Sequence, residues 1–248
     1  MAHQEERDRI LQEYERRARE IDPTLYAPWN PAEEFMRAGR RRWALRLLRR
    51  QHCFPEPSDS ILEIGYGNLG WLGEMLAWGI LPENLHGIEL DPKRAAQARR
   101  TLPTSDLQIG DARQLPWPSN SFALAIASTV WTSVLDSETR QAMASEVVRV
   151  LRPGGALLWY DFRVNNPRNP NVRGIGRQEI RELFHPLQGP IRSLTLAPPL
   201  ARRLLPGAHW LATTLETIPL LRSHLLAVLR KPSSGVVDGR TPSENQEL

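Results

Sequence analysis

A glycine-rich turn follows the first short apolar segment that has the character of a strand. The sequence there, Ile61-Leu-Glu-Ile-Gly65-Tyr-Gly67-Asn-Leu-Gly70, has the pattern ExGxGxxG. Glycines accept a positive φ and let the backbone pass close to a ligand, and the helix that follows offers free N–H groups. The pattern is typical of a nucleotide-binding turn, but a purely structural strand-to-helix turn has the same composition.

Acidic residues stand at the ends of three successive expected strands. Glu89 lies 19 residues beyond Gly70, where its carboxylate could accept hydrogen bonds from two ribose hydroxyls. Asp111 follows the third strand, and its carboxylate together with the N–H of Ala112 could bind the edge of an adenine. Glu63 places another carboxylate at the end of the first strand. These residues predict a nucleoside-containing ligand.

Strand-like and helix-like segments alternate along the chain after Ser60. Such alternation requires crossover connections, so it predicts a Rossmann-like, doubly wound α/β fold whose seven-stranded, mostly parallel sheet has helices on both faces. The expected strands are residues 61–64, 85–90, 106–109, 122–128, 156–162, 191–196 and 224–230. The last two should form an edge hairpin, spaced by one apolar helix over 200–218. A turn is expected at Pro153-Gly154-Gly155.

Three parts are expected along the 248 residues. Residues 1–58 should form an N-terminal helical lid, residues 59–231 the Rossmann-like domain, and residues 232–248 a disordered tail. No uncharged apolar run reaches the roughly 18 residues that a membrane span needs. The single cysteine, Cys53, excludes an intrachain disulfide framework, and the six histidines show no metal-ligand spacing. The composition therefore favours a cytoplasmic protein without a metal.

The combination of Glu63, Glu89 and Asp111 with the LRPGG sequence at 151–155 resembles the class I S-adenosylmethionine-dependent methyltransferases. More narrowly, it is similar to the type 11 group that includes the quinone-biosynthesis methyltransferases. The resemblance covers roughly residues 60–161. It implies S-adenosylmethionine as the cofactor and transfer of its methyl group as the activity.

The resemblance also implies a role for each motif residue. The turn at Gly65 and Gly67 would lie against the methionine part of the cofactor, with Glu63 orienting its amino group. Glu89 would hold the ribose, Asp111 and Ala112 the adenine, and Ser128 and Val130 would face the methionine end. Tyr66 and Trp131 are candidates for cation–π contacts with the sulfonium, and ordinary packing beside the pocket is the alternative for both. The family usually has GxGxG, so the later glycine, Gly70, is a departure.

Relatives often carry a histidine pair where this chain has Trp131-Thr132-Ser133, which removes the simplest general base. Alignment of nucleophile and methyl can supply on the order of 7 to 11 kcal/mol, whereas a general base adds about 10²- to 10⁴-fold in rate. A base is therefore not required. Asp161, at the end of the fifth strand, is the candidate base, and a hydrogen-bonding role in the loop is its alternative.

The loop at 163–173 holds three arginines and four asparagines. It should lie on the ligand side of the sheet, where Trp131, Arg168 and Arg173 are candidate contacts for the substrate. A small-molecule acceptor is expected, with the methyl moving to a hydroxyl of a glycan, a sugar or a secondary metabolite. A solvated loop would have the same composition.

Two segments keep other functions open. Residues 37–50 carry seven arginines and no acid, although the net charge is only +4. These arginines are scattered around the expected helix, which favours a solvated surface over nucleic-acid binding. The alternatives are an RNA methyltransferase, a cofactor-binding homologue without activity and, more distantly, a nicotinamide dehydrogenase. Residues 200–221 could lie on a membrane surface as a peripheral contact, or simply cover the sheet's edge.

Overall fold

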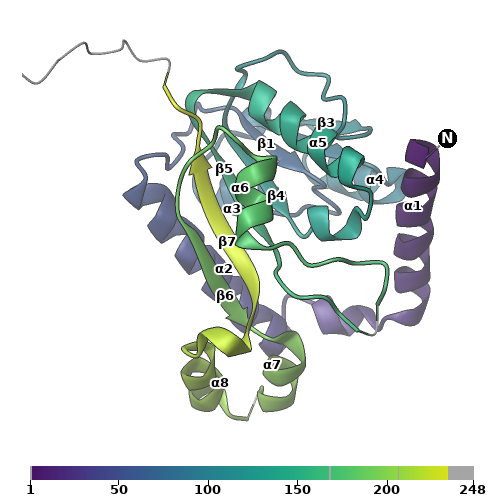
Figure 1. Ribbon diagram of the computed structural model, residues 1–248, viewed down its shortest axis with the longest axis vertical. Coiled ribbons are helices and arrows are strands. Elements are labelled where there is room, and N and C mark those ends of the chain that lie inside the picture. Colours follow the sequence, from purple (N-terminus) through teal and green to yellow (C-terminus); the bar gives the residue numbers. More distant parts are fainter. Residues whose placement is uncertain (1, 168, 206, 234–248) are drawn as a thin grey trace, which may run out of the picture.

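One sheet of seven strands, in the order β3-β2-β1-β4-β5-β7-β6, organises the chain (Figure 1). The computed structural model describes residues 2–167, 169–205 and 207–233. The strands are β1 (Ile61–Ile64), β2 (Leu85–Glu89), β3 (Asp106–Ile109), β4 (Phe122–Ser128), β5 (Leu151–Phe162), β6 (Ile191–Leu196) and β7 (Arg222–Arg230). Strands β1 to β5 are parallel, and β7 runs antiparallel to both β5 and β6. The predicted doubly wound fold with its edge hairpin is confirmed.

Helices cover both faces of this sheet. They are α1 (Ala2–Glu20), α2 (Pro31–Arg50), α3 (Leu72–Ala77), α4 (Pro92–Thr101), α5 (Ser137–Val150), α6 (Arg177–Leu183), α7 (Pro198–Leu204) and α8 (His209–Glu216), with short 3-10 turns η1 (Pro23–Tyr26), η2 (Pro82–Asn84), η3 (Trp131–Ser133) and η4 (Pro219–Leu221). Helices α2, α3 and α4 share one buried cluster with the sheet, and α5 and α6 share the other. Along β4, Leu124 and Ile126 enter the first cluster while Ala125 and Ala127 enter the second, as the two-residue period of a strand requires.

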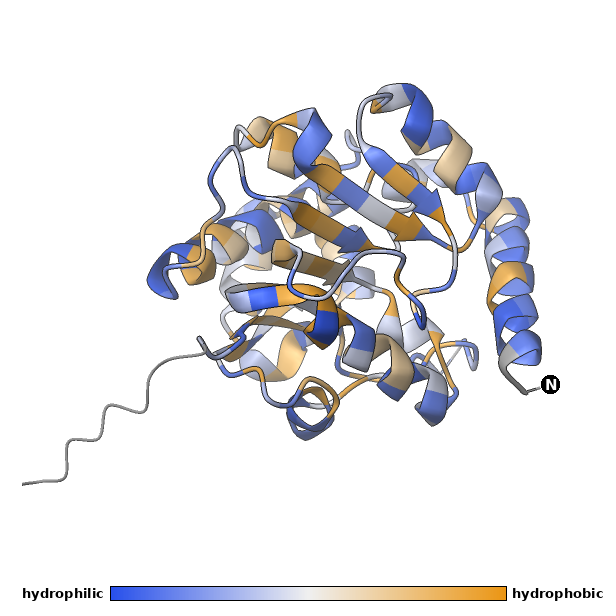
Figure 2. Ribbon diagram, turned by 90° about the horizontal axis from the view of Figure 1, so that it is seen from above, coloured by the Kyte–Doolittle hydropathy of each residue, from blue (hydrophilic) through white to orange (hydrophobic). Residues whose placement is uncertain are grey.

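Helix α1 stands apart from these layers and is largely hydrophilic along its length (Figure 2). Its Ile10 is buried and joins the cluster under α5, and Tyr14 packs against the same cluster. This narrow apolar contact holds α1 beside the carboxyl ends of the strands.

Two expected elements differ from the structure. Residues 200–218 form two helices, α7 and α8, and not one, because Pro206-Gly207 in the sequence interrupts the helical pattern. Residues 153–155 lie within β5, where Leu151 pairs with Phe122 and Ala156 already pairs with Leu124. The extra residues bulge out of the ladder.

Within the described ranges, no helix combines the length and the apolar character needed to cross a membrane. The expected tail lies mostly at 234–248, outside the residues that the structure describes.

Candidate functional site

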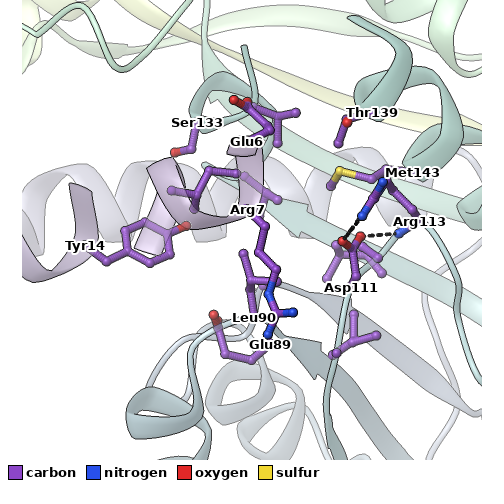
Figure 3. A pocket seen from close by; sticks show the side chains of 18 residues that line it. Glu6, Arg7, Tyr14, Glu89, Leu90, Asp111, Arg113, Ser133, Thr139 and Met143 are labelled. Carbon is purple, nitrogen blue, oxygen red and sulfur yellow. Dashed lines mark hydrogen bonds and ion pairs between the residues drawn. The ribbon is translucent and has the colours of Figure 1, made fainter. Parts of the chain in front are cut away.

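A cavity of about 60 Å³ lies where β1, β2 and β3 end and is closed on one side by α1 (Figure 3). The strand ends and the segment after β4 supply part of its wall, and α1 contributes Glu6, Arg7, Ile10 and Tyr14. Five residues that the sequence assigned to the cofactor line it: Gly65, Glu89, Asp111, Ala112 and Val130. The topology thus brings together residues that are up to 65 positions apart, as expected for the ligand edge of a doubly wound sheet.

The carboxylate of Glu63 holds the glycine turn from behind and does not line the cavity. It accepts hydrogen bonds from the backbone N–H of Trp71, at 2.8 and 2.9 Å, and from that of Leu72 at 3.0 Å. A Cβ at Gly70 would lie 2.3 Å from Glu63 Oε1, and the φ of Gly70 is +54°. The position of the third glycine, which departs from the family pattern, is therefore set by the Glu63 carboxylate.

Burial raises the pKa of Glu63 to about 8, although the N–H groups of Trp71 and Leu72 act against that shift. The side chain is 1% exposed. Glu63 is thus poised to hold a proton near neutral pH while it fixes the start of α3.

Glu89 connects the same turn to the cavity. Its Oε2 accepts a hydrogen bond from the N–H of Gly67 at 2.7 Å, and its Oε1 accepts one from the N–H of Asp91 at 3.0 Å. A carboxylate oxygen can accept more than one hydrogen bond. Glu89 can therefore order the glycine turn and still accept a hydrogen bond from a hydroxyl group in the cavity.

Asp111 stands on the opposite wall and pairs with Arg113, whose Nη2 donates to Asp111 Oδ2 at 2.7 Å. Burial alone would raise the pKa of Asp111, but the hydrogen bonds from Arg113 hold it below its ordinary value. From α1, Arg7 extends toward the strand ends between Glu89 and Asp111 (Figure 3). Both acids thus face a cationic side chain.

Hydrogen bonds to Glu6 and Glu13 help to fasten helix α1 over the cavity. The N–H groups of Leu135 and Asp136 donate to Glu6 Oε1 at 2.5 and 3.3 Å. The side-chain amides of Asn169 and Asn171 donate to Glu13 at 3.2 and 2.9 Å. Two asparagines of the loop that was predicted to meet the substrate therefore bind α1.

Arg40, on α2, is a residue that the sequence analysis did not single out. Its guanidinium carbon lies 4.7 Å from the ring centre of Trp71 and 5.3 Å from that of Tyr160, and its Nη1 donates to Ser128 Oγ at 3.3 Å. Its Nε is buried and has no hydrogen-bond partner among the described residues. The helical spacing Met36, Arg40, Ala44 puts Arg40 on the buried stripe of α2, and this signal was available in the sequence.

Neither predicted aromatic neighbour of the sulfonium is among the residues that line the cavity. The ring of Tyr66 is fully buried, its hydroxyl donates to the carbonyl of Gln108, and Gly87 leaves room for it. Trp131 packs edge-on against Phe184 in the core under α5. Side chains with large apolar area are drawn into the core even next to a ligand turn.

The residues predicted for catalysis and substrate binding do not join the cavity either. Asp161 is 1% exposed and accepts hydrogen bonds from the hydroxyl and N–H of Thr132, at 2.6 and 3.1 Å. Burial raises its pKa to about 6. These contacts make Asp161 the anchor of η3, in line with the alternative role. Arg173 is ion-paired with Glu179, and Arg168 lies outside the described residues.

In this chain, a glycine turn and the acidic ends of adjacent strands meet at one cavity of a doubly wound sheet. This arrangement is typical of α/β proteins that bind a nucleotide cofactor. Residues 61–155 match the family model described as a methyltransferase domain. This match confirms the resemblance to the class I S-adenosylmethionine-dependent methyltransferases that was seen in the sequence.

Comparisons with individual proteins agree. A phthiotriol/phenolphthiotriol dimycocerosates methyltransferase of Mycobacterium leprae is 32% identical over 152 residues, 60% of this chain and 53% of that protein. The 2-methyl-6-phytyl-1,4-hydroquinone methyltransferase of Synechocystis is 26% identical over 139 residues, 52% of this chain and 42% of that protein. The chain thus spans about half the length of these relatives. A methyltransferase structure from Thermotoga maritima has a TM-score of 0.57 at 20% identity and covers 93% of this chain and 100% of that one.

The raised pKa of Glu63 has a consequence for stability. Because the folded protein binds this proton more tightly than the unfolded chain, Glu63 makes the free energy of unfolding fall as the pH rises from about 4.5 to about 8. The slope is at most about 1.4 kcal/mol per pH unit. Glu63→Gln should flatten this dependence relative to the wild type. Urea unfolding at pH 5, 6, 7 and 8 measures it, and parallel curves for the two proteins would contradict the assignment.

Proposed function

We propose that this protein is an S-adenosylmethionine-dependent methyltransferase that acts on the hydroxyl of a small molecule. The observation that carries the proposal is the placement of Glu89 and Asp111 on adjacent strand ends, facing one cavity beside an open glycine turn. When bound, the cofactor supplies an activated methyl group on its sulfonium. The chain's own residues have to bind that cofactor and align the acceptor.

Each wall of the cavity suits one part of the cofactor. Glu89 would accept hydrogen bonds from the ribose hydroxyls, and Asp111 with the N–H of Ala112 would bind the adenine. The methionine end would lie along Gly65 toward Ser128, where the guanidinium of Arg40 can pair with its carboxylate. The buried Nε of Arg40 has no hydrogen-bond partner and Arg40 forms no ion pair among the described residues, which favours an anionic group at that place.

Replacing Glu89 by Gln should weaken binding of S-adenosylhomocysteine by about 10- to 100-fold, because a hydrogen bond to a charged group contributes roughly 1.5–3 kcal/mol. Isothermal titration measures this. Glu83→Gln is the matched control, since Glu83 is exposed on η2. Equal affinities of the two variants would remove the ribose assignment, and absence of binding by the wild type would remove the proposed function.

The cavity also implies that α1 opens. A volume of about 60 Å³ is well below the roughly 300 Å³ of the smallest ordinary ligand sites. Helix α1 forms one wall through Arg7, Ile10 and Tyr14, and its fastening at Glu6 and Glu13 is polar and reversible. We therefore assign to the N-terminal segment the role of a lid that closes over the bound cofactor.

Glu6→Ala should release one end of this lid. The expected results are faster tryptic cleavage within α1 and dissociation of S-adenosylhomocysteine that is several-fold faster in stopped-flow measurements. Glu15→Ala is the control, because Glu15 makes only an exposed ion pair with Lys93. If both variants matched the wild type, α1 would have no part in cofactor release.

The nature of the acceptor follows from what surrounds the cavity. No histidine or cysteine is among the residues that line it, which suits a reaction driven by alignment of the acceptor. Since Asn169 and Asn171 are engaged by Glu13, the loop gives less support to a sugar than its composition suggested. The named activities of the two curated relatives concern a lipid and a prenylated hydroquinone. An apolar secondary metabolite with a hydroxyl group therefore has the best support.

Transfer of labelled methyl groups from S-adenosylmethionine can be measured against three acceptor sets: hydroxylated lipids and prenylated phenols, free sugars and glycans, and short RNAs. We expect product only with the first set. Product with sugars alone would restore the glycan acceptor, and product with RNA would point to the arginines of α2. Cofactor binding without product from any set would favour a homologue without activity.

A further inference from the structure

A second cavity, of about 600 Å³, runs along β6, at the edge of the sheet opposite β3. We call it the β6 groove. Helices α2, α6 and α8 border it, together with the start of β7. The cofactor cavity lies at the ends of β1, β2 and β3, so the β6 groove is a separate feature of the molecule.

Positive charge dominates the β6 groove. Four arginines line it, Arg177, Arg181, Arg192 and Arg222, against the single carboxylate of Glu216. Arg222 donates to the backbone carbonyls of Glu216 and Thr217 at 2.6 and 3.0 Å, which fixes its position without neutralising it. Arg192 lies over the ring of Trp43 at 5.4 Å. None of the four forms an ion pair within the described ranges, so the groove offers guanidinium groups that an anion could neutralise.

Exposed apolar side chains lie on the elements beside this groove. Trp210 and Leu220 are 71% and 83% exposed, and Ile218 is 43% exposed. Trp210 precedes the groove residue Thr213 by one helical turn on α8, and Ile218 directly follows the groove residue Thr217. Helices α7 and α8 form the lower end of the molecule in Figure 1. The exposed apolar groups therefore adjoin the arginine-lined groove where the β6 edge meets the end of the molecule formed by α7 and α8.

We propose that this end docks on the surface of an anionic lipid bilayer. Lipid phosphates enter the β6 groove and bind its arginines, whose planar guanidinium suits phosphate oxygens. Trp210 lies at the level of the headgroups, as indoles do at membrane interfaces, while Leu220 and Ile218 reach the acyl boundary. The arginines of the groove require a negatively charged partner. The exposed aliphatic side chain of Leu220 favours a lipid surface, because a nucleic acid offers few apolar groups for it to contact.

This inference goes beyond the proposed function, because docking requires neither the cofactor nor methyl transfer. It would bring the protein to the place where apolar acceptors are dissolved. It also gives residues 200–221 a defined role, with α8 and η4 as the part that touches the membrane.

Co-sedimentation with lipid vesicles tests the docking. One set of vesicles consists of phosphatidylcholine alone, and the other contains 30% phosphatidylglycerol, which makes its surface anionic. The whole protein should sediment with the anionic vesicles only, and less at high salt. Arg192→Gln should weaken this binding about fivefold, since each arginine near such a surface contributes on the order of a factor of five. Trp210→Ser should weaken it at least as much.

Arg100→Gln and Leu81→Ser are the matched controls, because Arg100 and Leu81 are exposed but lie outside the β6 groove and outside α8 and η4. Both should bind as the wild type does. Titration with S-adenosylhomocysteine shows that each variant is folded and keeps its cofactor site, so loss of docking and loss of the proposed function are separate outcomes. No sedimentation with anionic vesicles, or equal losses in test and control variants, would overturn the proposal. Gel-shift binding of RNA without vesicle binding would assign the groove to nucleic acid.

Discussion

The buried carboxylate of Glu63 is the constraint on which the ligand edge of this protein depends. Removing a carboxylate from water costs free energy, and two backbone N–H groups at the start of α3 offset part of that cost. The bonds require the chain to pass so close to Glu63 that only a glycine fits at position 70. The turn shaped in this way presents the N–H of Gly67 to Glu89, and Glu89 in turn faces the cavity.

A second constraint is the separation of the arginines of α2 into two environments. Arg40 lies on the buried stripe of the helix, between two aromatic rings, and its charge is felt by Glu63. Burial lowers the pKa of Arg40, with the charge of Arg37 acting in the same direction. The other arginines of the segment lie on the remaining faces, and Arg46 stacks with Trp43 beside the β6 groove. One sequence run thus contacts both the ends of β4 and β5 and the β6 edge of the sheet.

The cap over the cavity is made of polar contacts between segments that are distant in the sequence. Glu13 binds two asparagines more than 150 residues away, and Glu6 binds the turn before α5. Burial opposes ionisation of Glu6, but the hydrogen bond from Arg9 holds its pKa below the ordinary value. Because these contacts are polar and join α1 to distant segments, they suit the lid role that is proposed for α1.

The sequence by itself determined the sheet, the glycine turn and the acidic strand ends. Hydrophobic periodicity and helix caps such as Asp91 are local, and a parallel sheet brings its carboxyl ends together without further information. Only the tertiary structure decided the directions of the side chains near the glycine turn. Tyr66 and Trp131 turned into the core and Asp161 became a loop anchor, because burial area and hydrogen-bond partners come from other segments. The engagement of Asn169 and Asn171 by α1, and the gathering of arginines from α6, β6 and β7 along one edge, likewise depend on long-range packing that no local pattern encodes.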